Sequence, residues 1–138
     1  MTTVFADAGY WIAIINPLEM LHLKAKKLAQ TYVNAKLITT ELVLVELLNF
    51  YAAGGSRMRS LAVRYVAQIR QNSSVEVIGL ESALFDKGHQ LYANRPDKEW
   101  GMVDCVSFVV MQERGLTDAL AYDHHFQQAG FRALMREA

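Results

Sequence analysis

The chain has 138 residues, 52% of them hydrophobic, and its 14 lysines and arginines balance its 14 aspartates and glutamates. This length and apolar content predict a single domain over residues 1–138 with a substantial core. The net charge of zero argues against a general nucleic-acid binder that depends on many phosphate contacts, but it is compatible with a nuclease that has a local basic rim.

Cysteine content and the N-terminus bear on the cellular setting. Cys105 is the only cysteine, which excludes an internal disulfide and argues against a cysteine-rich zinc site. The first 17 residues lack a basic region and contain Asp7, so they predict a strand and a turn into a helix instead of a signal peptide. No apolar segment approaches the length that spans a membrane, so we expect a cytoplasmic protein with no membrane partner.

Short strands alternate with helices in the first half of the chain. Pro17 stops one helical pattern, and Thr39 and Thr40 provide a helix start after the second strand. The predicted segments are strands over 3–6 and 36–39, and helices over 8–16, 19–34 and 41–53.

The second half continues the alternation after a break at Gly54, Gly55 and Ser56. The predicted segments are strands over 75–78, 119–122 and 131–134, and helices over 57–71, 81–93, about 100–114 and 124–128. Gly115 is expected to cap the apolar helix before it. Short apolar strands that alternate with helices predict an α/β fold with a parallel sheet covered on both faces.

Four carboxylates from distant segments are predicted to reach one edge of this sheet. Asp7 follows the first strand and Asp123 follows the fourth, and ligands of open parallel sheets bind beyond the carboxyl ends of strands. Glu46 lies on the second turn of the helix after the second strand, and Asp104 begins a helix that leads toward the same edge. Their mutual repulsion would require a cation, and all-oxygen ligands favour Mg²⁺ or Mn²⁺.

Each acid also has a structural explanation. Asp7 and Asp123 stand where helix N-caps are common, and Asp104 in a first helical turn complements the helix dipole. Glu46 is harder to explain, because the surrounding ELVLVELLNF is otherwise so apolar that its carboxylate would need a distant arginine as partner.

Other catalytic signatures are missing from the sequence. His22, His89, His124 and His125 lack zinc-site spacing, and we interpret them as surface or loop residues, with His124 a candidate for a pocket rim. No phosphate-binding glycine loop, nucleophile elbow or dinucleotide fingerprint appears.

Four pieces of the sequence carry a family resemblance: FADAGYWIAIINP, TTELVLVELLNF, DKEWGMVDCVSFVVMQERG and LAYDHHFQQAGFRAL. In this order and spacing, over nearly the whole chain, they resemble the PIN domain, and within it the VapC-type toxins of bacterial and archaeal toxin–antitoxin pairs. The resemblance implies a three-layer α/β/α fold with about five parallel strands. It also implies hydrolysis of RNA by one or two Mg²⁺ or Mn²⁺ ions.

The resemblance assigns the acidic quartet to Asp7, Glu46, Asp104 and Asp123. Asp7, Asp104 and Asp123 are then expected to hold the metal, and Glu46 to orient the attacking water or act as base. Ser107 matches a position that often lines the family's pocket. The chain departs from the family pattern at Ala8 and Gly9, where a serine or threonine usually follows the first aspartate.

Substrate and partner contacts are expected around this pocket. Arg95 and Lys98 lie in the loop before Asp104 and are candidates for phosphate contacts, whereas the four arginines over 57–70 more readily form a solvated helix face. The resemblance also implies a cognate antitoxin and a homodimer. The antitoxin would occupy a groove for which Tyr10, Trp11, Phe50 and Tyr51 are candidates, although core burial is the alternative for them.

Two rival interpretations remain at this level. A PIN-fold protein without catalysis would serve only as a binding or scaffold module, and the complete acidic quartet speaks against it. The other rival is a different metal-dependent phosphodiesterase or phosphatase, or a small α/β signalling domain.

Overall fold

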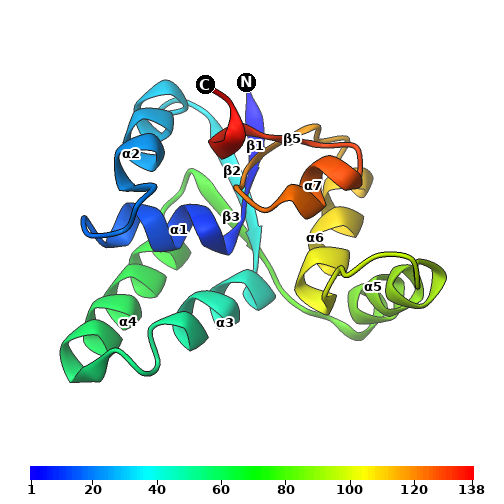
Figure 1. The fold of residues 1–138 in the computed structure, drawn as a ribbon, viewed down its shortest axis with the longest axis horizontal. Coiled ribbons are helices and arrows are strands. Elements are labelled where there is room, and N and C mark those ends of the chain that lie inside the picture. The colour runs from blue at the N-terminus through cyan, green and yellow to red at the C-terminus, as the bar shows by residue number, and fades with distance from the viewer.

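The computed structural model describes residues 1–138 and has a five-stranded sheet at its centre (Figure 1). All neighbouring strands are parallel, in the order β3-β2-β1-β4-β5. The strands are β1 (Thr3–Ala6), β2 (Lys36–Thr40), β3 (Val75–Ile78), β4 (Asp118–Leu120) and β5 (Arg132–Ala133). The predicted α/β fold with a parallel sheet of about five strands is confirmed.

Seven helices form the two outer layers, and a short 3₁₀ helix (Leu134–Arg136) ends the chain. Helices between β1, β2 and β3 lie on one side of the sheet and the others on the opposite side (Figure 1), as right-handed crossovers require when the chain reverses direction across the sheet. The first group is α1 (Ala8–Ile15), α2 (His22–Thr31), α3 (Glu41–Phe50) and α4 (Gly55–Gln71). The second is α5 (Ser82–Asn94), α6 (Met102–Glu113) and α7 (His124–Gln128).

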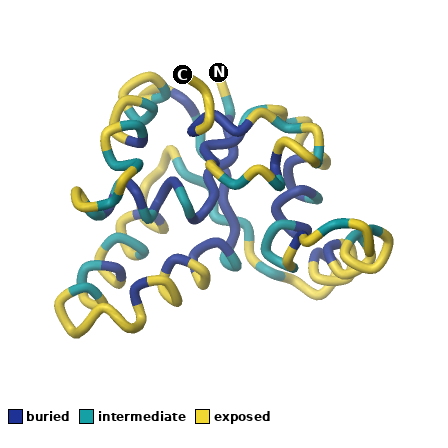
Figure 2. Tube along the Cα trace, in the orientation of Figure 1, coloured by how far each residue is buried: buried dark blue, intermediate teal, exposed yellow.

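Buried residues follow the strands and the inner faces of α1 and α6, whereas α4 and α5 are largely exposed (Figure 2). The aromatic ring of Phe108 packs edge-on against both Trp100 and Phe126, with 5.0 Å between ring centroids in each pair. These contacts hold α6 and α7 together over the sheet and so fix the segments that carry Asp104 and Asp123. None of the helices combines the length and apolar character needed to cross a membrane.

Element boundaries differ from the predictions mainly at glycine and proline. The second helix begins at His22 because residues 17–21 after Pro17 form turns, and α4 starts at Gly55, whose positive φ of 88° turns the chain. The last strand contains only Arg132 and Ala133 before the 3₁₀ helix begins. Gly115, with φ of 65°, ends α6 as predicted.

The contact between α5 and α6 depends on a missing side chain at Gly88. A Cβ atom there would lie 2.6 Å from Cγ2 of Val106. We predict that Gly88→Ala lowers the free energy of unfolding by roughly 1–3 kcal/mol, because the β-branched valine cannot move aside easily. Chemical denaturation measures this loss.

Gly9→Ala is the matched control, because Gly9 is also helical and an added Cβ has no neighbour within 4 Å. This variant should be neutral or more stable by up to about 1 kcal/mol, as helix propensity alone dictates. Equal stability changes in the two variants would contradict the proposed close packing of α5 on α6.

Candidate functional site

Strand order reverses between β1 and β4, and two aspartates lie beyond the carboxyl ends of these strands. Asp7 directly follows β1, and its backbone N–H donates to the Leu120 carbonyl at the end of β4 over 3.0 Å. Asp123 caps α7, where its Oδ1 accepts the N–H of His125 over 2.9 Å. Asp7 occupies the cap position of α1 without a side-chain cap hydrogen bond. Both side chains therefore start at the switch point where open parallel sheets bind ligands.

Asp104 reaches the same region from the first turn of α6. Its Oδ2 accepts the backbone N–H of Gly101 over 3.1 Å, which fixes the carboxylate at the helix start. This is the structural role expected of an acid in a first helical turn. It leaves the other carboxylate oxygen for a ligand, so both roles are compatible.

Glu46 is placed differently from its prediction. We expected it to be enclosed in an apolar helix, which is wrong, because α3 buries only Val43, Leu44 and Leu47 and exposes Glu46. The apolar residues Val45 and Leu48, on either side of Glu46 in sequence, are exposed too. No lysine or arginine pairs with Glu46, so the alternative of a distant salt bridge is not supported.

A cavity of about 680 Å³, which we call the acid cavity, lies over these acids. Its lining includes the carboxylates of Asp7, Glu46 and Asp123. Met20 from the turn before α2, Phe50 at the end of α3 and Arg136 near the C-terminus also line it. Asp104 lies behind this lining and contacts it through His125. The cavity is wide enough for a cation and a substrate group together.

Burial and like charge raise the pKa values of these acids. Loss of hydration is the main cause that raises the pKa of Asp7 to about 8. The hydrogen bond from the N–H of Ala8 lowers this pKa, and the negative charges of the other three acids raise it further. Partial loss of hydration also raises the pKa values of Glu46 and Asp104, and the negative charges of Asp104 and Asp123 add to the shift at Glu46. The four acids therefore interact electrostatically in one group.

The donor set suits a hard divalent cation. Asp7 is only 6% exposed, yet no lysine or arginine pairs with it. A buried carboxylate is normally neutralised by protonation, by a basic side chain or by a metal. Carboxylate oxygens are the preferred ligands of Mg²⁺ and Mn²⁺. The residues present thus fit such an ion.

His125 is a member of the site that the sequence interpretation missed. Its Nδ1 lies 3.1 Å from Oδ2 of Asp104 and 3.3 Å from Oδ1 of Asp123, and its side chain is only 16% exposed. With carboxylate oxygens on this side, Nδ1 carries the hydrogen and donates it. Placing His125 at the surface or in a loop was wrong. The available signal was its position two residues after Asp123 on a one-turn helix.

Ser107 does not line the acid cavity, contrary to expectation. It is fully buried, and its Oγ has no hydrogen-bond partner. Residues three apart share a helix face, but the extra turn carries Ser107 away from the sheet edge into the core. The closeness of Ser107 to Asp104 in sequence therefore did not predict correctly whether Ser107 lines the cavity.

Arg95 and Lys98 lie in the loop before α6 but outside the lining of the acid cavity. Both guanidinium contacts of Arg95 go to Asp97 over 3.0 Å, and its Cζ lies 5.0 Å from the Trp100 ring centroid. Lys98 is half-buried and has no ion-pair partner. Of the two, Lys98 is the freer cation.

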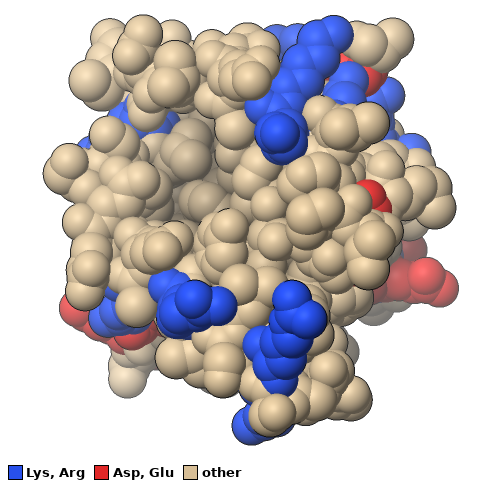
Figure 3. Space-filling view, turned by 90° about the vertical axis from the view of Figure 1, so that its left-hand side faces the viewer, with Lys and Arg blue, Asp and Glu red and all other residues tan.

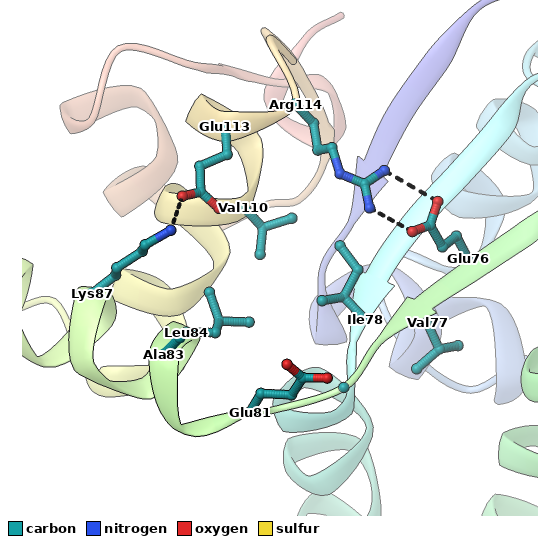
Figure 4. Close-up of a pocket in the computed structure, with 11 residues that line it drawn as sticks. Glu76, Val77, Ile78, Glu81, Ala83, Leu84, Lys87, Val110, Glu113 and Arg114 are labelled. Carbon is teal, nitrogen blue, oxygen red and sulfur yellow. Dashed lines mark hydrogen bonds and ion pairs between the residues drawn. The ribbon is translucent and has the colours of Figure 1, made fainter.

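A second cavity, of about 420 Å³, separates β3 from α5 and α6, and all of its charged side chains except Glu81 form ion pairs (Figure 4). Arg114 binds Glu76 with both terminal nitrogens, and Lys87 binds Glu113. Arg114 and Lys36 hold the pKa of Glu76 at about 2. Because both basic side chains of this cavity are already paired with acids, we interpret it as a structural junction between the sheet edge and α6.

The face formed by α1, α2 and α4 is hollowed and shows more lysine and arginine than acid (Figure 3). Of the arginines on α4, Arg57 and Arg64 are exposed without partners, whereas Arg59 binds the carbonyl of Ala52 and Arg70 binds Glu41. None of them lines the acid cavity. The solvated helix face expected for these arginines is confirmed.

Comparison with known proteins links the fold to one family. The PIN domain family model matches residues 4–132. Two relatives, each named 23S rRNA-specific endonuclease VapC20, come from Mycobacterium tuberculosis strains CDC 1551 / Oshkosh and ATCC 25618 / H37Rv. Both are 30% identical over 131 residues, which cover 93% of this chain and 95% of the relative.

A solved structure shows the same arrangement. The crystal structure of Mycobacterium tuberculosis VapC20, described as a Sarcin-Ricin loop cleaving toxin, matches with a TM-score of 0.84 and 26% identity. The match covers 94% of this chain and 97% of that one. Sequence and structure therefore agree over almost the full length.

The raised pKa of Asp7 predicts a pH-dependent stability. Its pKa is about 8 in the folded chain and near 3.8 when unfolded. Between pH 4 and pH 8 Asp7 ionises in the unfolded chain but stays largely protonated in the folded chain, so the free energy of unfolding falls as the pH rises. Asp7→Asn removes this penalty. In chelator, the variant should be more stable at pH 8 by roughly 1–4 kcal/mol, with a smaller gain at pH 5.

Thermal and chemical unfolding at several pH values test this prediction. Asp86→Asn, which removes an exposed acid on α5, serves as the matched control and should change stability little at any pH. A gain for Asp7→Asn that does not vary between pH 5 and pH 8 would contradict the burial of an ionisable, uncompensated Asp7.

Proposed function

The chain belongs to the PIN domain family, and on that premise we propose that it is a metal-dependent endoribonuclease toxin of the VapC type. The observation that carries this proposal is the convergence of Asp7, Glu46, Asp104 and Asp123 at the switch point of the sheet, with no lysine or arginine paired to any of them. Such a site attracts a divalent cation, and a bound divalent ion can activate water to hydrolyse a phosphodiester without a covalent nucleophile from the protein.

Asp7, Asp104 and Asp123 would hold Mg²⁺ or Mn²⁺, and His125 keeps two of these carboxylates in place. A bound divalent ion lowers the pKa of a coordinated water and neutralises charge on the phosphoryl oxygens. Glu46 is exposed to the cavity and has no hydrogen bond to the protein, so it is free to orient the attacking water or accept its proton. The products would carry a 5′-phosphate and a 3′-hydroxyl.

RNA is the substrate class that the relatives favour. The similar VapC20 proteins are named as specific for 23S rRNA, and the matching crystal structure is that of a Sarcin-Ricin loop cleaving toxin. We extend this to the present chain as the first RNA to test, with the cytoplasm as the place of action because ribosomal RNA is there. Because Ala8 and Gly9 have no hydroxyl group, the ion would be held by carboxylates alone, with His125 positioning two of them.

A cognate antitoxin is the partner that this function requires, and the apolar rim of the cavity supports it. Met20 is 95% exposed and Phe50 is 54% exposed, and both line the cavity. Exposed apolar side chains next to a charged site favour a protein partner. Tyr10, Trp11 and Tyr51 are buried in the core, so of the four aromatic candidates only Phe50 is available. A homodimer also remains a prediction from the family.

Removal of one acid tests the catalytic proposal. We predict that Asp104→Asn lowers the rate of Mg²⁺- or Mn²⁺-dependent cleavage of a sarcin–ricin stem-loop RNA by at least roughly 100-fold, because a ligand to the metal is lost. Gel analysis of end-labelled RNA, with and without chelator, measures the rate.

Asp86→Asn controls for loss of negative charge, since Asp86 is exposed on α5 and should leave cleavage unchanged. Circular dichroism should show both variants folded. Full metal-dependent activity in Asp104→Asn would remove this residue from the catalytic site, and no cleavage by the wild-type chain would refute the proposed substrate.

The loop before α6 gives a separate prediction about substrate binding. Arg95→Gln with Lys98→Gln should raise KM by about 3–10-fold and change kcat little, because both are proposed to contact phosphates and not the reacting atoms. Lys98→Gln alone should account for most of the effect, since Arg95 is already bound to Asp97. An unchanged KM in the double variant would exclude the contact.

A further inference from the structure

Arg136 is the one lysine or arginine that lines the acid cavity. It belongs to the 3₁₀ helix at the C-terminus and shares the cavity wall with Tyr122 and His124. Four carboxylates line the same cavity: Asp7, Glu19, Glu46 and Asp123. A negatively charged substrate that enters this cavity meets one fixed positive charge.

The guanidinium of Arg136 is held by Tyr122 and not by an acid. Its Cζ lies 4.5 Å from the centroid of the Tyr122 ring, and its Nε donates to the Tyr122 carbonyl. A cation above an aromatic face is stabilised, and planar guanidinium groups stack there readily. These contacts fix the plane of the group while leaving its outer edge free.

The terminal nitrogens of Arg136 have no hydrogen-bond partner in the protein. Four other arginines, Arg70, Arg95, Arg114 and Arg132, each pair with a carboxylate. Arg136 therefore differs from them, because it is oriented and yet unpaired although acids line the same cavity. An oriented guanidinium with two free N–H₂ groups is suited to bind a phosphate through two hydrogen bonds.

We infer that Arg136 binds a backbone phosphate of the RNA substrate at the cavity wall, and that Tyr122 is the positioning residue that presents it. This inference rests on the proposed ribonuclease function. Phosphate is favoured over an acidic side chain of a protein partner because the cavity that Arg136 lines is the one in which the scissile phosphodiester must approach the acids. There the positive charge of Arg136 offsets repulsion between the RNA backbone and those carboxylates of the cavity that no cation neutralises.

Steady-state cleavage of the sarcin–ricin stem-loop RNA in Mg²⁺ tests the inference. Arg136→Gln should raise KM by about 5–30-fold while kcat stays within about threefold, because a phosphate contact away from the reacting atoms is lost. The dependence of log(kcat/KM) on log salt concentration should become shallower by about 0.7–1, as expected for one phosphate contact fewer. Arg136→Lys should give an intermediate KM, because lysine keeps the positive charge but cannot donate two parallel hydrogen bonds to one phosphate.

Tyr122 provides the positioning test. Tyr122→Phe keeps the ring under the guanidinium and should behave as wild type, whereas Tyr122→Leu should raise KM toward the value of Arg136→Gln without changing the salt dependence. Arg64→Gln is the matched control, since Arg64 is exposed, unpaired and outside the cavity lining. It should leave KM and the salt dependence unchanged.

The outcomes separate this inference from the proposed function. If the wild-type chain cleaves the RNA and Arg136→Gln shows the same KM and salt dependence as the wild type, the phosphate contact is refuted and the ribonuclease function stands. The contact is refuted in the same way if Arg64→Gln raises KM as much as Arg136→Gln does. If the wild-type chain neither binds nor cleaves the RNA in Mg²⁺, both the proposed substrate and the contact are refuted.

Discussion

A buried carboxylate without a basic partner is the constraint on which the site depends. Asp7 directly follows the central strand β1, so the parallel sheet places it at the switch point, and packing of α1 leaves it 6% exposed. Burial and three neighbouring acids raise its pKa to about 8. The ionised form of Asp7 is therefore destabilised in the folded chain unless a cation is present, and this is the electrostatic basis of the metal binding that we propose.

The groups around Asp7 are arranged to order the acids and not to neutralise them. The Gly101 N–H and the His125 ring fix Asp104, and the His125 N–H fixes Asp123. The one arginine at the cavity wall is held by Tyr122. Elsewhere the chain readily forms ion pairs, as around Glu76. The contrast indicates a site that receives its cation and its phosphate from outside, as the proposed endoribonuclease requires.

Local signals in the sequence were sufficient for the sheet and for the acids that end its strands. Asp7 and Asp123 follow apolar strands, and parallel pairing brings such ends together whatever the intervening sequence. The second helix begins later than predicted, because turns follow Pro17. Near the glycines, α3 ends at Phe50 and turns occupy residues 51–53, so that α4 begins at Gly55, slightly earlier than predicted. The Glu46 position was found, but its exposure was not, since a helix at the edge of a small domain leaves apolar residues partly exposed.

Contacts between distant segments could not be predicted in this way. His125 reaches Asp104 across 21 positions, and Arg136 reaches Tyr122 across 14, and neither pairing leaves a periodic signal. Ser107 shows the opposite error, because closeness in sequence to Asp104 suggested a place in the cavity although α6 carries it into the core. Such residues depend on how helices dock, which is decided by packing over the whole sheet.

Calorimetric titration of the metal-free chain with Mn²⁺ at pH 7, in two buffers of different ionisation enthalpy, tests the central claim most directly. Because Asp7, with a pKa of about 8, is mostly protonated at this pH, cation binding should be saturable and should release close to one proton per chain. The release should be much smaller at pH 9. An absence of saturable binding, or binding at pH 7 without proton release, would contradict the claim that a cation replaces a proton at the four acids.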